Sequence, residues 1–341
     1  MSWIVPAAAV PRRTYSRPRL GRLAVVVALL FAGCATPLRA EIAPSFGRLQ
    51  ELRAQELRVA SVAYRLSVAG RALCRGAMAG QPGFTMHGIE QYDVADRPVV
   101  AAGFALGRHA GVMAVVAGSP ADRAGLKADD QLVSVNGRVL SLAAADPGNR
   151  PTRAAVEQSE KIVSEEMKTG EVTIRVLRAG GLRDVRFVPE LGCVTKVELV
   201  PGRQVNAWAD GDRVVISAGI VEQCGTDADL ALVIAHEIAH NLLGHSHKLA
   251  RASGRSEVMR LRGSGAAAMR QTEEEADRLA VVLASAASYD LARAEAFMAR
   301  LLENPDGANA AETHPAADRR LKLLGAAIAA ARRPSPELPA R

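Results

Sequence analysis

Residues 236–240 read His-Glu-Ile-Ala-His, which places two imidazoles and a carboxylate close together. The surrounding residues 230–242 repeat apolar side chains at three- and four-residue spacing, which predicts a helix with one apolar face. Because residues four apart project from the same side of a helix, His236 and His240 can bind one zinc ion. Glu237 lies beside them and can act as a general base toward a water molecule at that ion.

A helix with two incidental histidines is the alternative. It is disfavoured because unpaired imidazoles are costly to bury in so apolar a helix. A catalytic zinc ion takes three protein ligands and keeps one position open. In the pattern HExxHxxGxxH, a glycine comes three residues and a third histidine six residues after the second histidine. Here Gly244 comes four residues after His240, and His245 and His247 come five and seven residues after it, so the pattern is not matched. Glu273 is the better third ligand.

Glu273 lies in the acidic stretch 271–277, where we expect a second helix capped by Thr272. Acidic residues also stabilise the first turn of a helix through its dipole, so the carboxylates here have a purely structural alternative. Next to a pair of histidines, a carboxylate ligand is favoured. Residues 246–270, between the two expected helices, are basic and rich in small residues, which indicates either a lid or a solvated loop.

Three motifs together resemble metallopeptidase family M48, the gluzincin group that contains the HtpX, BepA, Oma-type and CAAX-prenyl endopeptidases. They are the HEIAH sequence at 236–240, the ExxxD sequence at 273–277 and Thr-His-Pro at 313–315. The resemblance extends over about residues 195–332 and includes residues 206–219, which are similar to the strand segment before the active helix.

The resemblance implies a role for each matching residue. The zinc ligands, for one ion per chain, would be His236, His240 and Glu273, with Glu237 as the base. It further implies that Asp277 holds a ligand imidazole and that His314 approaches the zinc or supports the substrate oxyanion. The alternative for His314 is an ordinary residue at the start of a helix.

Residues 118–137 closely resemble the bacterial PDZ signature. A short helix is followed by a turn at Gly125 and a strand that ends in the hairpin turn Asn136-Gly137. We expect a helix over 154–167 and paired strands beyond it. Such domains bind an extended peptide at a sheet edge, although a role as a structural spacer is the alternative. Residues 103–106 are a weak match to the loop that binds a peptide carboxylate.

Residues 1–40 contain six arginines and no acidic residue, and residues 23–33 are an apolar run, which fits a secretory signal. The leader could be lipidated at Cys34 or cleaved after Ala40. We therefore expect a periplasmic or membrane-tethered protein. The net charge is +7, and seven minus the six leader charges leaves +1, which argues against a nucleic-acid partner.

The expected organisation follows from these features. An amphipathic helical segment (41–94) packs on the protein or contacts a membrane surface, a PDZ-like domain spans 95–192, the peptidase domain spans 193–332, and a tail spans 333–341. Cys74 and Cys193 flank the PDZ-like domain, so we predict a disulfide between them that joins its two ends. Cys224 is expected to be a buried thiol that packs and does not react.

The sequence therefore predicts an α+β fold, with a mainly α-helical gluzincin zinc-protease domain and a small β-rich PDZ-like domain. The predicted function is that of an exported zinc metalloendopeptidase acting on polypeptides, among them misfolded envelope proteins. One alternative is a self-inhibited protease, with His314 at the open zinc position, that acts mainly as a chaperone or adaptor. The other is a PDZ scaffold with a structural zinc ion.

Overall fold

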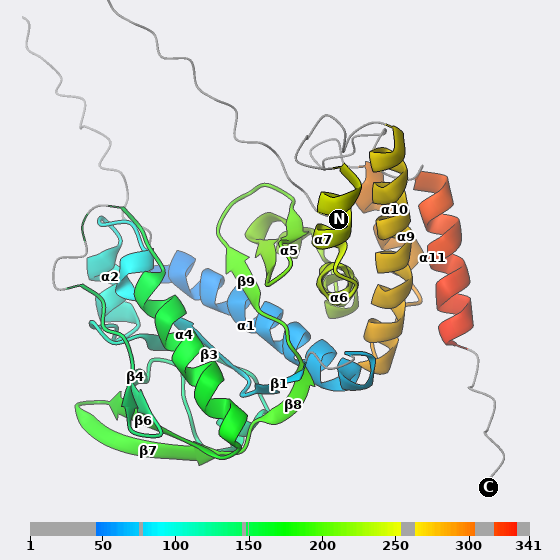
Figure 1. Ribbon diagram of the computed structural model, residues 1–341. Coiled ribbons are helices and arrows are strands. Elements are labelled where there is room, and N and C mark those ends of the chain that lie inside the picture. The colour runs from blue at the N-terminus through cyan, green and yellow to red at the C-terminus, as the bar shows by residue number, and fades with distance from the viewer. Residues whose placement is uncertain are drawn as a thin grey trace, which may run out of the picture.

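Helix α1, Phe46–Ala69, is shared by the two halves of the protein, as Figure 1 shows in blue. In this computed structural model, residues 46–74, 78–144, 148, 150–253, 263–303 and 317–332 are described. The second half of α1 buries Val59, Val62 and Leu66 in the large core of the peptidase half. Its first half buries Leu49 in a smaller cluster beside the PDZ-like half. Residues at three- and four-residue spacing thus bind α1 to both halves.

An antiparallel sheet forms the PDZ-like half, with strand order β2-β3-β4-β6-β7 and β5 paired to β4. The strands are β2 Phe84–His87, β3 Gly111–Val115, β4 Gln131–Val135, β5 Arg138–Val139, β6 Val172–Arg178 and β7 Gly181–Phe187. Asn136 and Gly137 have φ angles of 48° and 80°, the left-handed values that a tight hairpin turn requires. This turn joins β4 to β5, where the sequence placed it.

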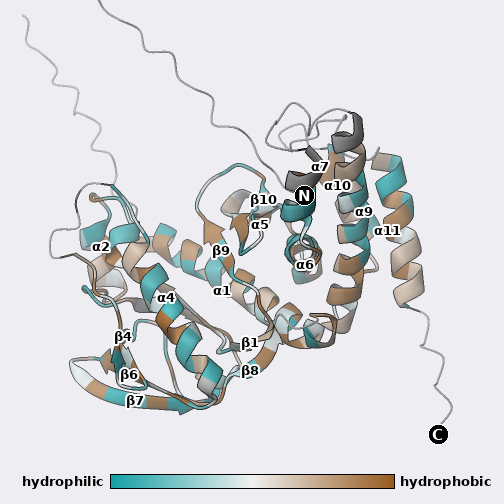
Figure 2. Cartoon of the chain, in the orientation of Figure 1, coloured by the Kyte–Doolittle hydropathy of each residue, from teal (hydrophilic) through white to brown (hydrophobic). Residues whose placement is uncertain are grey.

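Helix α4, Ala154–Glu166, covers one face of this sheet. It buries Val156, Ile162 and Val163 in the core of the domain, and Figure 2 shows apolar and polar residues alternating along it. The other helical elements of this half are η2 Ile89–Gln91, α2 Arg97–Gly103, α3 Pro120–Arg123 and η3 Met167–Thr169, whereas η1 Gly70–Leu73 follows α1 and contacts β8 and α9.

Two expectations for this half are wrong in detail. Strand β2 pairs with β3, so the sheet begins before residue 95, where the sequence analysis placed the start of the domain. The proposed carboxylate-binding loop at 103–106 does not line the cavity at the edge of β2, and its Phe104 is buried and stacks on Arg53 of α1.

The peptidase half combines a three-stranded sheet, of order β10-β11-β9, with a group of helices. Its strands are β9 Val197–Val200, β10 Ala207–Ala209 and β11 Val214–Ser217; β11 pairs in parallel with β9 and antiparallel with β10. The helices are α5 Ala218–Gln223, α6 Asp227–Leu242, α7 His245–Ser253, α9 Gly263–Ala286, α10 Ala294–Glu303 and α11 Ala317–Ala331. The predicted α+β class, mainly helical with a small β-rich domain, is confirmed.

Helix α9 begins at Gly263, so the expected start near Thr272 is wrong. Residues 266–268 are alanines, the strongest helix formers, and they extend the helix toward its N-terminus. Thr272 is therefore inside the helix, where its hydroxyl donates to the carbonyl of Met269. The segment expected to be a lid or loop is partly helical, because α7 and the start of α9 lie within it.

A short ribbon closes the base of the PDZ-like half. Strand β1, Met78–Gln81, pairs antiparallel with β8, Glu190–Cys193, and Met78 lies opposite Cys193. The structure contains the predicted disulfide between Cys74 and Cys193, which are separated by 119 positions. Cys224 is free and buried, and burial raises the pKa of its thiol to about 12, which makes it unreactive.

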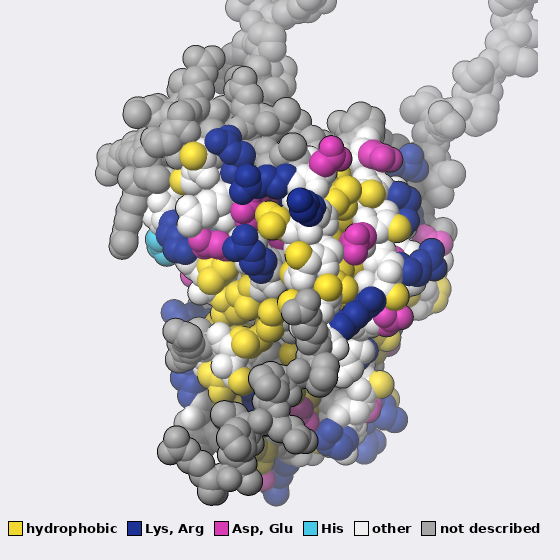
Figure 3. Space-filling view, turned by 90° about the vertical axis from the view of Figure 1, so that its right-hand side faces the viewer, with side chains coloured by type: hydrophobic (Ala, Val, Ile, Leu, Met, Phe, Trp, Pro, Cys, Tyr) yellow, Lys and Arg dark blue, Asp and Glu magenta, His cyan; other side chains and the backbone are white. Residues whose placement is uncertain are grey.

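The surface carries both signs of charge. On the face shown in Figure 3, lysine and arginine side chains lie among acidic ones, with apolar side chains between them. Among the described helices, none is both long enough and apolar enough to cross a membrane.

Replacing both Cys74 and Cys193 by serine should lower the free energy of unfolding by about 5 kcal/mol, because the unfolded chain gains the entropy of a long open loop. Guanidinium denaturation followed by circular dichroism measures this change. The control is Cys224→Ala, which leaves the disulfide intact and should cause a smaller shift. An equal shift in the two proteins would contradict the prediction.

Candidate metal centre

Helix α6 starts with a capping box that fixes its first turn. The Thr226 hydroxyl accepts from the Asp229 backbone N–H at 3.1 Å, and the Asp229 carboxylate accepts from the Thr226 N–H at 3.0 Å. Every residue from 229 to 240 is buried. The helix is therefore enclosed on all sides, and not only along the one apolar face that the sequence predicted. His236 and His240 lie in its final turns.

Helix α9 packs along α6 and brings Glu273 to the two histidines. The Nε2 atoms of His236 and His240 are 3.1 Å apart, and each is 3.5 Å from an oxygen of the Glu273 carboxylate. All three side chains are about 95% buried or more. The structure thus brings together the three ligands proposed from the sequence.

The spacing of these atoms fits a zinc ion. Ligand bonds of about 2.0–2.1 Å in a tetrahedron place neighbouring ligand atoms about 3.3 Å apart. The observed separations, from 3.1 to 3.5 Å, lie on both sides of this value. Two imidazole nitrogens and one carboxylate oxygen are also a donor set that zinc prefers in catalytic sites.

The remaining nitrogen of His236 faces Asp277. Its Nδ1 lies 2.9 Å from Asp277 Oδ1, so a proton on Nδ1 leaves Nε2 free to bind metal. Asp277 lies one turn after Glu273 on α9, which is why the same helix supplies both carboxylates. The role expected for Asp277, which is to orient a ligand imidazole, agrees with this placement.

His240 is supported by His245, at the start of α7. The two Nδ1 atoms are 2.9 Å apart, and His245 Nε2 lies 3.2 Å from Glu275 on α9. Burial lowers the pKa of His245 to about 4, so its ring is neutral and its Nδ1 can accept a hydrogen bond from the Nδ1–H of His240. The sequence suggested His245 only as a candidate metal ligand. In the structure it contacts His240 on the side away from the ligand atoms.

Arg320, on α11, was missed by the sequence analysis. Its guanidinium is 99% buried and makes a bidentate contact with Asp277. Nε donates to Oδ2 at 2.9 Å, and Nη2 donates to Oδ1 at 2.7 Å. Although burial raises the pKa of Asp277, the Arg320 charge and the His236 contact lower it well below its usual value. The available signal was the stripe of Arg320, Leu324 and Ile328, which share the buried face of α11 at four-residue spacing.

Glu237 follows the first ligand on α6 and is 99% buried. Burial raises the pKa of its carboxyl group, which makes it a stronger proton acceptor when ionised. His314 and the leader residues, including Cys34 and Ala40, lie outside the described residues, so their predicted roles stay predictions. The arrangement offers three metal ligands, a buried base and a layer of partners behind the ligands.

A site with two ligands on one buried helix and a carboxylate ligand from a second helix is typical of metallopeptidases. The family model described as peptidase family M48 matches residues 186–269, and that of the PDZ domain matches residues 111–146. The chain therefore contains a segment that matches peptidase family M48 and, inserted ahead of it, a segment that matches a PDZ domain. The insertion agrees with the fold, since α1 precedes the PDZ domain in sequence but packs in the peptidase core.

Among curated proteins, none matches the chain. One similar solved structure is an HtrA-type protease, AlgW, with a decapeptide. The similarity covers 34% of this chain and 30% of that chain, at 19% sequence identity and a TM-score of 0.23.

Replacing Arg320 by methionine should lower the free energy of unfolding by about 3–5 kcal/mol, because the Asp277 charge stays buried without its partner. Thermal or chemical denaturation of the zinc-loaded protein measures the change.

The neighbouring residue provides a matched control. Arg319 pairs with Glu274, but its side chain is 67% exposed, so Arg319→Met should leave the unfolding transition almost unchanged. Equal losses in the two variants would exclude a special contribution of the Arg320–Asp277 pair.

Proposed function

We propose that the protein is an exported, zinc-dependent endopeptidase that hydrolyses peptide bonds in polypeptide substrates. The observation that carries the proposal is the triangle of two imidazole nitrogens and one carboxylate oxygen at tetrahedral spacing, one residue away from a buried carboxylate. A structural zinc site takes four protein ligands. Among the described residues the cluster has three, which supports a catalytic site with an open position.

Each side chain has a definite task in this proposal. His236 and His240, through Nε2, and Glu273, through its carboxylate, would hold one zinc ion. When bound, zinc polarises the scissile carbonyl and lowers the pKa of a water molecule. Glu237 accepts the proton of the attacking water and then donates it to the leaving amine. Asp277 and His245 keep the imidazoles oriented through their Nδ1 atoms.

Strand β10 is suited to align a substrate. It is an end strand of its sheet, with β11 on one side and no described strand on the other. It also packs against α6, the helix that carries both histidines. An extended polypeptide that pairs with the outer edge of β10 would therefore run beside the ligand cluster.

The PDZ domain offers a second place for an extended chain. A cavity of about 970 Å³ lies between the two halves and is lined by consecutive residues from Gly83 to His87, together with residues of α4, α1 and β9. Side chains alternate along a strand, so a run of consecutive lining residues indicates that the edge of β2 faces the cavity. The outer side of β2 has no partner among the described strands, so a peptide can pair with it.

Export and a role in envelope protein quality control complete the proposal. The arginine-rich, apolar leader supports export, and a buried disulfide suits an oxidising compartment such as the periplasm. Strands β10 and β2 would pair mainly with the backbone of a bound polypeptide, so they would accept many unfolded sequences. This favours misfolded envelope proteins as substrates.

Replacing Glu237 by glutamine should lower kcat/KM for casein by roughly a hundred- to ten-thousandfold, because glutamine cannot accept the proton of water. Zinc content, measured by elemental analysis, should stay at one ion per chain. Glu157→Gln, an exposed change on α4, is the control for charge removal and should leave the rate unchanged. Full activity of Glu237→Gln would exclude the proposed base.

Removing the metal with 1,10-phenanthroline should abolish casein cleavage and lower the melting temperature, because the Glu273 carboxylate then lies buried beside two metal-free imidazoles. Adding zinc back should restore both properties. A preparation without zinc that still cleaves casein would rule out a metal-dependent mechanism.

A further inference from the structure

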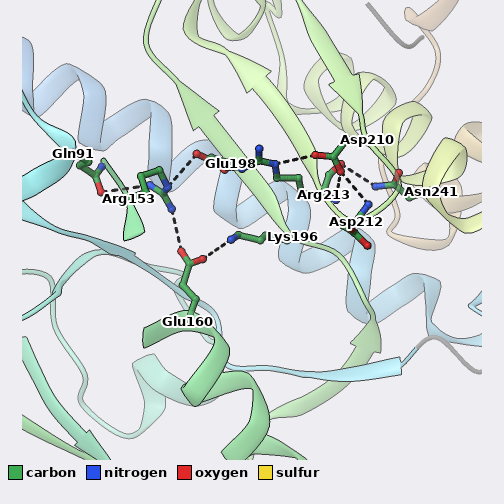
Figure 4. Close-up of polar contacts among 9 residues, drawn as sticks. All are labelled: Gln91, Arg153, Glu160, Lys196, Glu198, Asp210, Asp212, Arg213 and Asn241. Atoms are coloured by element: carbon green, nitrogen blue, oxygen red, sulfur yellow. Dashed lines mark hydrogen bonds and ion pairs between the residues drawn. The ribbon is translucent and has the colours of Figure 1, made fainter. Parts of the chain in front are cut away.

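A line of charged and polar side chains crosses from the PDZ domain to the catalytic helix (Figure 4). It begins at Arg153, at the start of α4, passes through Glu198 on β9 and ends at Asn241 on α6. Asn241 directly follows the ligand His240. The line therefore connects the PDZ domain to the catalytic helix, in addition to the packing of α1 and the disulfide-linked β1–β8 ribbon.

At the PDZ end, Arg153 makes three contacts. Its guanidinium lies 3.1 Å from Glu160 on the same helix and 3.1 Å from Glu198, and it donates to the Gln91 side chain at 3.4 Å. Lys196, on the strand side, pairs with the other oxygen of Glu160 at 2.6 Å. Side chains from α4 and from the segment around β9 are thus held together by opposite charges.

Glu198 is the centre of the line. Its side chain is only 10% exposed, and its two oxygens serve different partners: Oε1 faces Arg153, and Oε2 accepts from Arg213 at 3.0 Å. A largely buried carboxylate held by two guanidinium groups is strongly constrained, because displacing either group removes one of its two charge-assisted contacts. Movement of Arg153 is therefore opposed through Glu198 by Arg213.

The far end fixes the turn that joins β10 to β11. Arg213 pairs with Asp210 within that turn, at 3.0 Å. The Asn241 side chain clamps the same turn to α6: its oxygen accepts from the Gly211 N–H at 2.8 Å, and its nitrogen donates to the Arg213 carbonyl at 3.0 Å. Gly211 has a φ angle of 108°, which permits the close approach.

We propose that Arg153, Glu198, Arg213 and Asn241 are positioning residues that make the placement of strand β10 beside the catalytic helix depend on the PDZ domain. This inference rests on the proposed function, in which β10 aligns the substrate. Several residues of the line, among them Gln91, Arg153, Glu160 and Glu198, also line the cavity at β2. A polypeptide bound there contacts the line directly, so binding at the PDZ domain sets the register of substrate and metal site.

The activity test uses the full-length, zinc-loaded protein with casein as substrate. Glu198→Gln and Arg213→Met should each lower kcat/KM roughly ten- to a hundredfold, because a substrate misplaced by about 1 Å reacts far more slowly. The double variant should lose little more than either single one, since both break the same line. Zinc content should not change.

A matched control separates this effect from the loss of any ion pair. Arg175→Met removes the exposed Arg175–Asp184 pair on β6 and β7, off the line, and should leave kcat/KM within twofold of the wild type. Arg153→Met, in the same domain and with the same chemistry, should lower it as Glu198→Gln does. Equal behaviour of Arg153→Met and Arg175→Met would overturn the proposal.

Hydrogen exchange gives a readout that does not require catalysis. In Arg153→Met, the amides of residues 207–213 and the last turn of α6 should exchange several-fold faster than in Arg175→Met. Faster exchange confined to the neighbours of residue 153 would overturn the coupling. If the wild type with zinc cleaves nothing but the distant amides respond, the proposed function fails while the structural coupling stands.

Discussion

The contact between α6 and α9 is the interaction on which the rest of the structure depends. Two histidines from one helix meet two carboxylates from the other, and all four side chains are buried. Groups of this kind are costly to bury unless each has a partner. The partners come from α11, through Arg320, and from α7, through His245. Four helices must therefore be in place before the ligand atoms can hold their spacing.

Helix α1 explains how a second domain can be inserted without weakening this site. Its C-terminal half completes the peptidase core, while its N-terminal half contacts the PDZ side. The chain then leaves for the PDZ domain after Cys74 and returns at Cys193, where the disulfide joins departure and return. The peptidase core is thus assembled from segments that are far apart in the sequence.

The sequence predicted the parts of the site that follow from local spacing. The four-residue interval of His236 and His240, and that of Glu273 and Asp277, fix which side chains share a helix face, so their meeting could be expected. Cys74 and Cys193 were paired because they flank a domain. Arg320 and His245 were missed as supporting residues, because their roles depend on how α11 and α7 pack against α9. Such packing between distant helices cannot be predicted from the local spacing of residues. The early start of α9 was missed because the Gly and Ser around residues 263–265 looked like a loop, although the alanines that follow favour helix.

The disulfide has a topological consequence. Because it bridges 119 positions, the polypeptide between Cys74 and Cys193 is a covalent ring, with the PDZ domain inside it. A single nick anywhere in that ring, including one made by a neighbouring copy of the same enzyme, would leave both ends attached to the body. No fragment could diffuse away while the disulfide stays intact, and release of the PDZ domain would require a reductant.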